Sequence, residues 1–278
     1  MKKISRRSFM AAAAVSVAAL ALTACGGSAS SAASSVASSA ASSEAASSAA
    51  AAELTTVEAG KLTMATNATF PPYEMTTDSG ELEGIDVDTA KAIAEKLGLE
   101  LQIDDMDFDA ALLSVQQGKA DIVMAGVTVT DERKAVMDFS DSYATGIQSI
   151  IVPNDSDIAS PDDLAGKKIG TQRGTTGYIY CSDDFGEDSV VAYDNGLTAV
   201  QALNNGQVDA VVIDNAPATE YVAANPGLKV LDTSYAEEDY AIGMAKGSAL
   251  EDAVNKALEE LKADGTLQAI VDKYINAN

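Results

Sequence analysis

A segment of fifteen residues occurs twice in this chain, and the repetition limits the fold more than any other feature of the sequence. Residues 111–125 read ALLSVQQGKADIVMA, and they align without a gap on residues 199–213, which read AVQALNNGQVDAVVI. In each copy a helical pattern ends at a glycine, Gly118 or Gly206, and an aspartate then precedes a buried strand. A chain that carries this unit twice is predicted to fold as two similar α/β lobes.

Strand and helix signals also alternate around the first copy. In residues 86–97 the apolar side chains of Val87, Ala90 and Ile93 recur at helical spacing, and Gly98 is a stop signal. The order βαβαβ with short connections predicts a largely parallel sheet covered by helices. The expected strands span residues 62–65, 99–103 and 122–125, and the expected helices span residues 86–97 and 108–117.

The pattern recurs in the second half, and the end of the chain is expected to return to the first lobe. Further strands are expected at residues 147–152, 168–170, 190–192, 208–213 and 229–231. A strand-like run at 240–244 precedes helices at 250–262 and 266–275, which are expected to complete the first lobe. The first lobe is therefore predicted to comprise residues 54–145 and 243–278, and the second residues 146–242.

The N-terminus reads as an export signal followed by a tether. Four basic residues precede the apolar run 9–22, which is shorter than the about 20 apolar residues that span a bilayer. The sequence Leu22-Thr23-Ala24-Cys25 resembles the processing site of bacterial lipoproteins, where a cysteine becomes acylated. We predict a signal peptide over residues 1–24, lipidation at Cys25 and a Ser/Ala-rich disordered tether over residues 25–53.

Two features of this segment have alternative interpretations. Cys25 is otherwise an ordinary small residue at the end of a signal peptide, or half of a disulfide with Cys181. The pair Arg6-Arg7 fits a twin-arginine export motif or a general secretory signal equally well. With a lipid at Cys25, the mature protein is expected on the outer face of the bacterial cell membrane.

Composition excludes several classes of function. The chain has no histidine, which removes Ser-His-Asp and Cys-His catalysis and the commonest zinc sites. Its formal net charge of −24 argues against nucleic acids and anionic membrane surfaces as partners. Beyond Leu22 no apolar run is long enough for a transmembrane helix. We expect no metal, no cofactor and a monomeric protein.

The chemistry is expected where the strands of the two copies end, because open α/β sheets bind ligands at the carboxyl ends of their strands. After the first copy, Thr130 is a candidate N-cap and places Arg133 in a first helical turn, where the helix dipole disfavours a cation unless an anion binds there. A guanidinium suits a carboxylate, and Thr128 with free backbone N–H groups adds donors. Opposite, Asp214 suits an ammonium group. The pair predicts a site for the zwitterionic main-chain end of a free amino acid.

Structural alternatives exist for these residues. Arg133 has acidic neighbours, and an exposed ion pair with one of them is the plainer explanation. Asp214 is also placed to cap the helix that begins near Pro217. Thr175 and Thr176 follow the strand 168–170 and serve either as turn and cap residues or as carboxylate donors. The acidic neighbours of Arg133 are Asp131, Glu132 and Asp138.

Several ordered motifs between residues 60 and 275 together resemble the polar amino-acid-binding proteins of ABC importers, solute-binding protein family 3 of the type 2 periplasmic-binding-protein fold. They read ATNATFPPYE from residue 65, GIDVD from 84, AGVTVTDER from 125, DFSD from 138, GTTG from 174, VVID from 211 and KADGT from 262. The resemblance implies two lobes joined by two hinge strands, near residues 143–148 and 238–243. It also implies capture of a free polar amino acid between the lobes and delivery to the permease of an ABC transporter.

The same resemblance implies roles for single residues. Arg133 would hold the ligand carboxylate with Thr128, Thr176 and the main chain at Ala125 and Gly126. Asp214 would hold the ammonium group. Phe70 and Phe108 match positions where aromatic rings enclose the ligand side chain, although core packing is the alternative for each.

The side-chain end of the site departs from the family pattern. Asn67 stands where many relatives carry an acid, and Gln172 also occupies a side-chain contact position. Neutral amides favour a polar, uncharged ligand such as glutamine or cystine over a basic amino acid. Glu74, Asp105 or Asp107 would supply charge for the basic alternative. A dehydratase-like enzyme on the same fold is the rival from another class, but the sequence shows no suitable pair of carboxylates.

Overall fold

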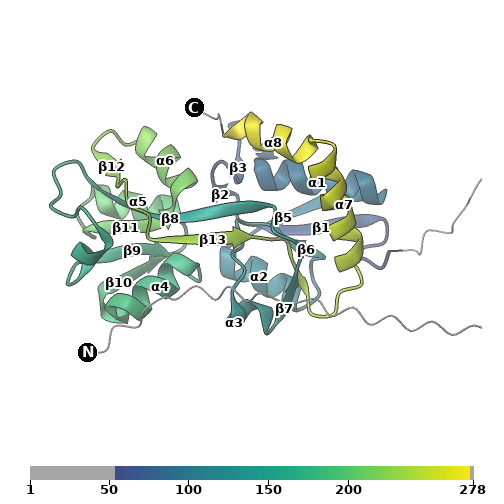
Figure 1. Cartoon of the computed structure of the whole chain (residues 1–278), viewed down its shortest axis with the longest axis horizontal. Helices are drawn as coiled ribbons and strands as arrows, with labels where there is room; N and C mark the ends of the chain where they lie inside the picture. The colour runs from purple at the N-terminus through teal and green to yellow at the C-terminus, as the bar shows by residue number, and fades with distance from the viewer. Residues whose placement is uncertain (1–53, 276–278) are drawn as a thin grey trace, which may run out of the picture. The chain divides into compact units, whose positions relative to one another are not determined.

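The computed structural model describes residues 54–275, which all lie in one compact unit of the chain (Figure 1). The predicted signal peptide, tether and lipidated Cys25 lie outside the described residues. Within residues 54–275 the two-lobed α/β arrangement expected from the repeat is confirmed, with one main sheet in each lobe. The boundaries predicted for the two lobes stay a prediction.

The first lobe is built on a five-stranded sheet with the order β5-β1-β6-β14-β7. Strand β1 runs parallel to β5 and β6, as the βαβαβ pattern predicts, whereas β14 is antiparallel to both β6 and β7. The strands are β1 (Lys61–Thr66), β5 (Glu100–Asp105), β6 (Ile122–Val123), β7 (Met137–Phe139) and β14 (Gly243–Ala245). The helices are α1 (Ile85–Leu97), α2 (Phe108–Gln116), α3 (Asp131–Lys134), α7 (Glu251–Ala263) and α8 (Thr266–Tyr274).

Helix α1 shows why the periodic segments form where the sequence places them. Val87, Ala90 and Ile93 are all buried, so the predicted apolar face is the face that packs on the sheet. Gly98 ends the helix with φ +70°, and its N–H donates to the carbonyl oxygens of the last turn. A left-handed residue at this position is most easily supplied by glycine. The helices α7 and α8, from the end of the chain, pack on α1 and complete this lobe (Figure 1).

The second lobe contains a six-stranded sheet with the order β10-β9-β11-β8-β12, and β13 also pairs with β8. Strand β9 is parallel to β10 and β11, and β8 is antiparallel to its three partners. The strands are β8 (Ala144–Pro153), β9 (Ile169–Gln172), β10 (Val190–Tyr193), β11 (Ala210–Asp214), β12 (Leu228–Val230) and β13 (Ala236–Tyr240). The helices are α4 (Thr176–Phe185), α5 (Gly196–Asn204), α6 (Asn215–Ala223) and the short 3-10 turns η1 (Pro161–Leu164) and η2 (Glu187–Ser189).

Strands β8 and β13 lie side by side in the second sheet and extend toward the first lobe (Figure 1). Their antiparallel register joins Gln148 to Ala236 at one end and Ala144 to Tyr240 at the other. The single strand predicted over residues 240–244 is wrong. Strand β13 ends at Tyr240, and the chain enters the first sheet as β14 at Gly243. The apolar run hides this change of sheet because the residues on both sides of it are buried.

A small third sheet was not expected from the sequence. It has the order β2-β3-β4, with β2 (Thr69–Phe70), β3 (Glu74–Thr76) and β4 (Leu82–Glu83). Strands of two or three residues are too short to show alternation of apolar and polar side chains. This sheet matters for function because it holds Phe70 and Glu74 beside the ends of β1 and β6.

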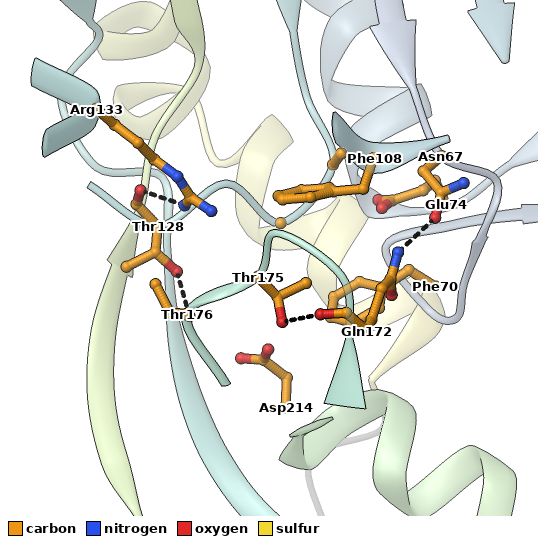
Figure 2. A pocket seen from close by; sticks show the side chains of 12 residues that line it. Asn67, Phe70, Glu74, Phe108, Thr128, Arg133, Gln172, Thr175, Thr176 and Asp214 are labelled. Carbon is orange, nitrogen blue, oxygen red and sulfur yellow. Dashed lines mark hydrogen bonds between the residues drawn. The ribbon is translucent and has the colours of Figure 1, made fainter. Parts of the chain in front are cut away.

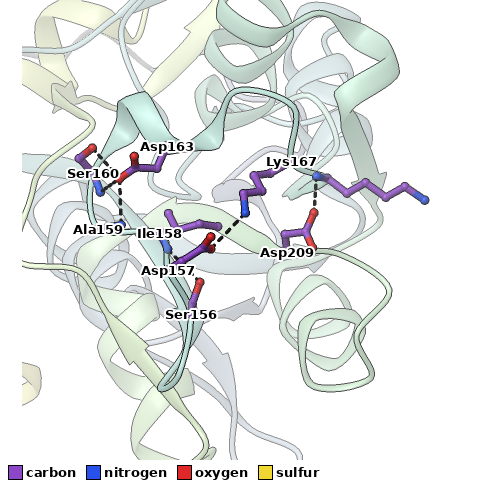
Figure 3. A network of polar contacts seen from close by, with 9 residues as sticks. Ser156, Asp157, Ile158, Ala159, Ser160, Asp163, Lys167 and Asp209 are labelled. Atoms are coloured by element: carbon purple, nitrogen blue, oxygen red, sulfur yellow. Dashed lines mark hydrogen bonds and ion pairs between the residues drawn. The ribbon is translucent and has the colours of Figure 1, made fainter.

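The aspartate of each repeat copy performs the same structural task. Asp121 accepts hydrogen bonds from the backbone N–H groups of Val57 and Thr63, both at 2.7 Å. Asp209 accepts one from the N–H of Lys168, also at 2.7 Å (Figure 3). In the first lobe the carboxylate therefore bonds within the neighbouring parallel strand β1, and in the second it bonds to the residue just before β9.

The segment between β8 and β9 carries its own polar network (Figure 3). The carboxylate of Asp163 accepts hydrogen bonds from the N–H groups of Ala159 and Ser160 and from the Ser160 hydroxyl. These bonds lower the pKa of Asp163, the largest cause being the one from the Ala159 N–H. The turn η1 thus begins in a capping box that satisfies its first backbone donors. Within residues 54–275 no helix is both long enough and apolar enough to cross a membrane.

We predict that Asp121→Asn lowers the free energy of unfolding by about 1–3 kcal/mol, because the new amide group faces one of two backbone donors and leaves it unpaired. Asp209→Asn is expected to cost less, since Asp209 is exposed and water replaces the lost bond. Urea denaturation of the purified protein measures both, with the exposed Asp232→Asn as the control. Equal losses for Asp121→Asn and Asp232→Asn would contradict this assignment.

Candidate functional site

A cavity lies between the two lobes, where β6 and β11 end. It is lined by all eleven residues predicted as ligand contacts and by Glu74 (Figure 2). The first lobe supplies Asn67, Phe70, Glu74, Phe108, Ala125, Gly126, Thr128 and Arg133, and the second supplies Gln172, Thr175, Thr176 and Asp214. Its internal volume of about 20 Å³ has room for about one water molecule, so the lining residues, and not the volume, are the evidence for a ligand site.

Arg133 is a buried cation in this cavity, with 8% of its surface exposed. Its guanidinium donates to the carbonyl oxygens of Thr128, at 2.7 Å, and Gly174, at 3.1 Å, so it contacts both lobes. It also lies 5.4 Å from the centre of the Phe108 ring. Burial lowers the pKa of Arg133, and the largest opposing effect comes from the charge of Glu238. Because both hydrogen-bond acceptors are neutral, the cation still lacks a directly bonded anion among the described residues.

The structural alternative for Arg133 is wrong, and so is part of the reasoning that favoured an anion beside it. Asp138 forms its ion pair with Lys246, at 2.6 Å, and Asp131 and Glu132 are exposed. Thr130 does cap α3, since its hydroxyl accepts the Arg133 N–H at 3.2 Å. The helix has only four residues, however, and Arg133 is the third of them, so it lies nearer the end of the helix than the start. The helix dipole therefore gives no argument for an anion.

Asp214 ends β11 and faces the same cavity (Figure 2). Its carboxylate accepts hydrogen bonds from the Tyr240 hydroxyl and from Nε2 of Gln148, the latter at 2.7 Å. It makes no capping bond to α6, so the capping alternative is wrong. Burial raises the pKa of Asp214 to about 7, with Glu238 adding to the rise while the bonds from Tyr240 and Gln148 oppose it.

The three threonines of the site have different partners. Thr175 caps α4 by accepting the Tyr178 N–H at 3.3 Å, and its hydroxyl donates to the Gln172 carbonyl at 2.8 Å, so the cap interpretation describes it. Thr176 is the first residue of α4, so the positive end of that helix lies at the cavity. The hydroxyls of Thr176 and Thr128 are each 3.0 Å from the same carboxylate oxygen of Glu238.

The two amides predicted to meet the ligand side chain bond to each other across the lobes. Nε2 of Gln172 donates to Oδ1 of Asn67 at 3.0 Å, and Nδ2 of Asn67 donates to the Met106 carbonyl at 2.8 Å (Figure 2). The amide of Asn67 is therefore oriented by its neighbours, with its oxygen toward the second lobe. Such a fixed pair presents hydrogen-bonding groups and no charge to the cavity.

The aromatic residues serve the cavity and the core together. Phe70 and Phe108 are 7% and 6% exposed, and both belong to apolar clusters while lining the cavity. Gly126 approaches Phe70 so closely that an added Cβ would lie 2.8 Å from its ring, and its φ of +55° also favours glycine. The N–H of Gly126 donates to Asp86 at 2.9 Å, which fixes this turn beside the cavity.

Glu74 lines the cavity although it was singled out from the sequence only as a possible source of charge. It is fully buried at the start of β3, and its pKa is raised well above the usual range by burial and then by the charge of nearby Asp86. Asp86 is itself held by the Tyr143 hydroxyl at 2.7 Å, and burial raises its pKa to about 6. Burial and the charge of Asp86 thus both favour the protonated form of Glu74 beside the cavity.

Glu238 and Gln148 were not predicted as part of the site. Glu238 lies in an acidic run, EED, whose charge gives no sign of which residue points inward. The alternation of buried and exposed side chains along β13 does indicate it, because Glu238 is two residues from the buried Tyr240 and lies on the same face of the strand. The expected strand began only at residue 240, so this signal was missed. The described residues contain no group of three or more His, Cys, Asp or Glu side chains suited to a metal ion.

Comparison with known proteins agrees with this geometry. A family model described as bacterial extracellular solute-binding proteins, family 3, matches residues 62–277. The L-cystine-binding protein TcyJ of Escherichia coli is 34% identical over 225 residues, which cover 80% of this chain and 85% of TcyJ. Two solved structures of an ancestral arginine-binding protein, bound to arginine and to glutamine, are each 44% identical. They align over 78% of this chain and 99% and 98% of their own, with TM-scores of 0.75 and 0.74.

We predict that Asp214 makes the ligand-free protein less stable as the pH rises from about 4 to about 7. In this window the unfolded chain releases a proton that the folded protein keeps, because burial holds the folded pKa near 7. As the pH rises, the free energy of unfolding of the wild type should therefore fall relative to that of Asp214→Asn, by up to about 1.4 kcal/mol per pH unit. Urea denaturation between pH 4.5 and 7.5 measures the slope, and the exposed Asp131→Asn is the control. Parallel profiles for Asp214→Asn and the wild type would show the assignment to be wrong.

Proposed function

Because the chain belongs to family 3 of the bacterial extracellular solute-binding proteins, we propose that it captures a free polar amino acid between its two lobes for an ABC importer. The observation that carries this proposal is a buried guanidinium and a buried carboxylate, from different lobes, that line one cavity. The lobes are proposed to comprise residues 54–145 with 243–278, and residues 146–242.

Arg133 is proposed to bind the carboxylate of the ligand. A guanidinium has five N–H donors, and the carbonyl oxygens of Thr128 and Gly174 take two of them. The remaining donors can bind a carboxylate, which would supply the anion that the buried cation lacks. The hydroxyl groups of Thr128 and Thr176 and the main chain at Ala125 and Gly126 would add donors.

Asp214 is proposed to bind the ammonium group. Its high pKa shows that the ionised form is poorly compensated in the ligand-free protein. An ammonium ion beside it would favour the ionised form, so the same interaction would stabilise ligand and protein together. Because Arg133 and Asp214 belong to different lobes, a zwitterion that contacts both would favour the closed arrangement.

The side chain of the ligand is proposed to lie between Phe70 and Phe108 and to meet Asn67 and Gln172. The neutral amides favour a polar uncharged side chain. A basic amino acid is the second candidate, because a cationic side chain beside Glu74 would favour the ionised form of its carboxyl group. This buried carboxyl group lines the cavity, and neither of its oxygens accepts a hydrogen bond from a donor group of the described residues. The relatives named above bind cystine, arginine or glutamine according to their descriptions, so these ligands form the natural test set.

A thermal-shift screen of the protein against L-cystine, L-arginine, L-glutamine and the other free amino acids is expected to give one or a few strong responses. A ligand at 100 times its dissociation constant stabilises the fold by about 2.7 kcal/mol. Arg133→Ala should then weaken binding at least about thirtyfold, because it removes one partner of a buried charge pair. The exposed Arg173, which pairs with Asp194, provides the control Arg173→Ala. Binding that survives in Arg133→Ala and falls in Arg173→Ala would refute the assignment.

We further propose that Cys25 carries a lipid, that the tether lets the monomeric protein reach the permease, and that the ligand is released unaltered, with no catalysis. The small residues before Cys25 and the Ser/Ala-rich segment after it support the anchor. The absence of histidine from the chain supports binding without histidine-dependent catalysis. Recovery of chemically altered ligand after prolonged incubation would favour an enzyme instead.

We predict that Cys25→Ser moves the protein from the membrane fraction to the soluble extracytoplasmic fraction, because a serine offers no thiol for acylation. Immunoblots of the two fractions measure the distribution. Cys181→Ser is the control and should stay in the membrane fraction, since Cys181 is a buried thiol of the second lobe. An unchanged distribution of Cys25→Ser would rule out the anchor.

A further inference from the structure

Glu238 is a buried carboxylate beside the cavity whose two oxygens have very different surroundings. Oε2 accepts three hydrogen bonds, all at 3.0 Å, from the hydroxyls of Thr128 and Thr176 and from Nε2 of Gln148. Oε1 is buried and accepts none from the described residues. Only 6% of the surface of Glu238 is exposed. Hydrogen bonds to a carboxylate are stronger than those to a neutral acceptor, so three donors on one oxygen hold the surrounding groups firmly in place.

The donors come from different parts of the molecule. Thr128 follows β6 in the first lobe, Thr176 begins α4 in the second lobe, and Gln148 lies in β8. Strand β13 belongs to the second sheet, so the bond from Thr128 to Glu238 is the one of the three that joins the two lobes. The two hydroxyls are 3.5 Å apart, so the junction is compact.

A threonine hydroxyl has one hydrogen to donate. Thr128 and Thr176 also line the cavity next to Arg133, where the carboxylate of an amino acid is proposed to bind. While a hydroxyl donates to Glu238, it offers only lone pairs to a ligand carboxylate, which itself carries no hydrogen at neutral pH. The ligand carboxylate and Glu238 therefore need the same hydrogens.

We propose that Glu238 is an internal competitor of the ligand carboxylate, which joins the two lobes in the ligand-free protein and lowers its affinity for amino acids. This inference rests on the proposed function for the effect on affinity, but the bridge between the lobes does not depend on any ligand. The charges near Glu238 are consistent with competition for the same site. The positive charge of Arg133 acts on Glu238 and is proposed to bind the ligand carboxylate, and the ionisable groups of Asp214 and Tyr240 also interact with Glu238.

The competition has a direct consequence for binding. A ligand carboxylate must take at least one hydroxyl hydrogen from Glu238, so part of its binding free energy is spent on opening that bridge. Any ligand-free population held closed by the bridge is also unable to bind, which reduces the apparent affinity in proportion. Weakening Glu238 as an acceptor should therefore loosen the ligand-free junction and tighten ligand binding.

The test uses the full chain with Glu238→Gln, which keeps the shape of the side chain and replaces a charged acceptor with a weaker neutral one. The matched control is Glu237→Gln, the same change at the adjacent, exposed position of β13. Glu238→Asp is the second variant, because it keeps the charge and withdraws the oxygens by one methylene group. Hydrogen–deuterium exchange of the ligand-free proteins reports the junction, and calorimetry with L-cystine, L-arginine, L-glutamine and L-histidine reports affinity.

In Glu238→Gln and Glu238→Asp, amides in peptides covering residues 126–133 and 172–178 are expected to exchange about fivefold faster than in Glu237→Gln. If these peptides exchange at the same rate in Glu238→Gln, Glu238→Asp and the control, the inference is overturned, whether or not a ligand binds. For a probe that binds the wild type, Glu238→Gln is expected to bind about fivefold more tightly, as the gain from one charged hydrogen bond exchanged for a neutral one. Weaker or equal binding of that probe would overturn the competition. Faster exchange with no binding of any amino acid by any of the proteins would leave the bridge supported and count against the proposed function instead.

Discussion

Burial of charge between the lobes is the constraint on which the site depends. Arg133, Asp214 and Glu238 are each less than 9% exposed, and removing such groups from water costs free energy unless partners replace the lost hydration. The protein supplies mostly neutral partners, namely backbone carbonyls, hydroxyls and the amide of Gln148. Two of the bonds, from Arg133 to Gly174 and from Thr128 to Glu238, also join the lobes, so compensation of the buried charges and the arrangement of the lobes are linked.

The internal repeat explains how two separate lobes come to place their charges at one cavity. In each copy the aspartate, Asp121 or Asp209, bonds to the backbone near the start of the neighbouring parallel strand and so aligns the two strands. Strands aligned at their starts bring their carboxyl ends to the same edge of the sheet. The loop after β6 then carries Thr128 and Arg133, and the end of β11 carries Asp214. Two units of the same pattern therefore place two edges that differ in charge at a shared space.

The sequence predicts the long periodic elements well and the short ones poorly. Helix α1 and strand β1 lie close to their expected positions because apolar spacing and the stop at Gly98 define them. Strands β2, β3 and β4 are too short for any periodic signal. The break between β13 and β14 was hidden because hydropathy shows that a segment is buried but not which sheet it joins.

The site shows a similar division. The positions of the strand ends predict Arg133 and Asp214 as site residues. The prediction of Asn67, Phe70, Phe108 and Gln172 depended on the family resemblance. All of them line the cavity. Glu74 lies in the small sheet that periodicity does not reveal, and Glu238 required the start of β13 to be placed four residues earlier. The missed groups are thus the acids whose position depends on tertiary structure.

The position of β14 has a consequence for the time course of folding. In the first sheet, β7 is connected to the other strands only through β14, which comes more than 100 residues later in the chain. The edge of that sheet cannot form until the whole second lobe has been synthesised. Pairing between such distant segments slows folding, because a long loop must close before the contact stabilises anything. A polypeptide emerging from the ribosome would therefore keep its first lobe incomplete until nearly its last residues appear.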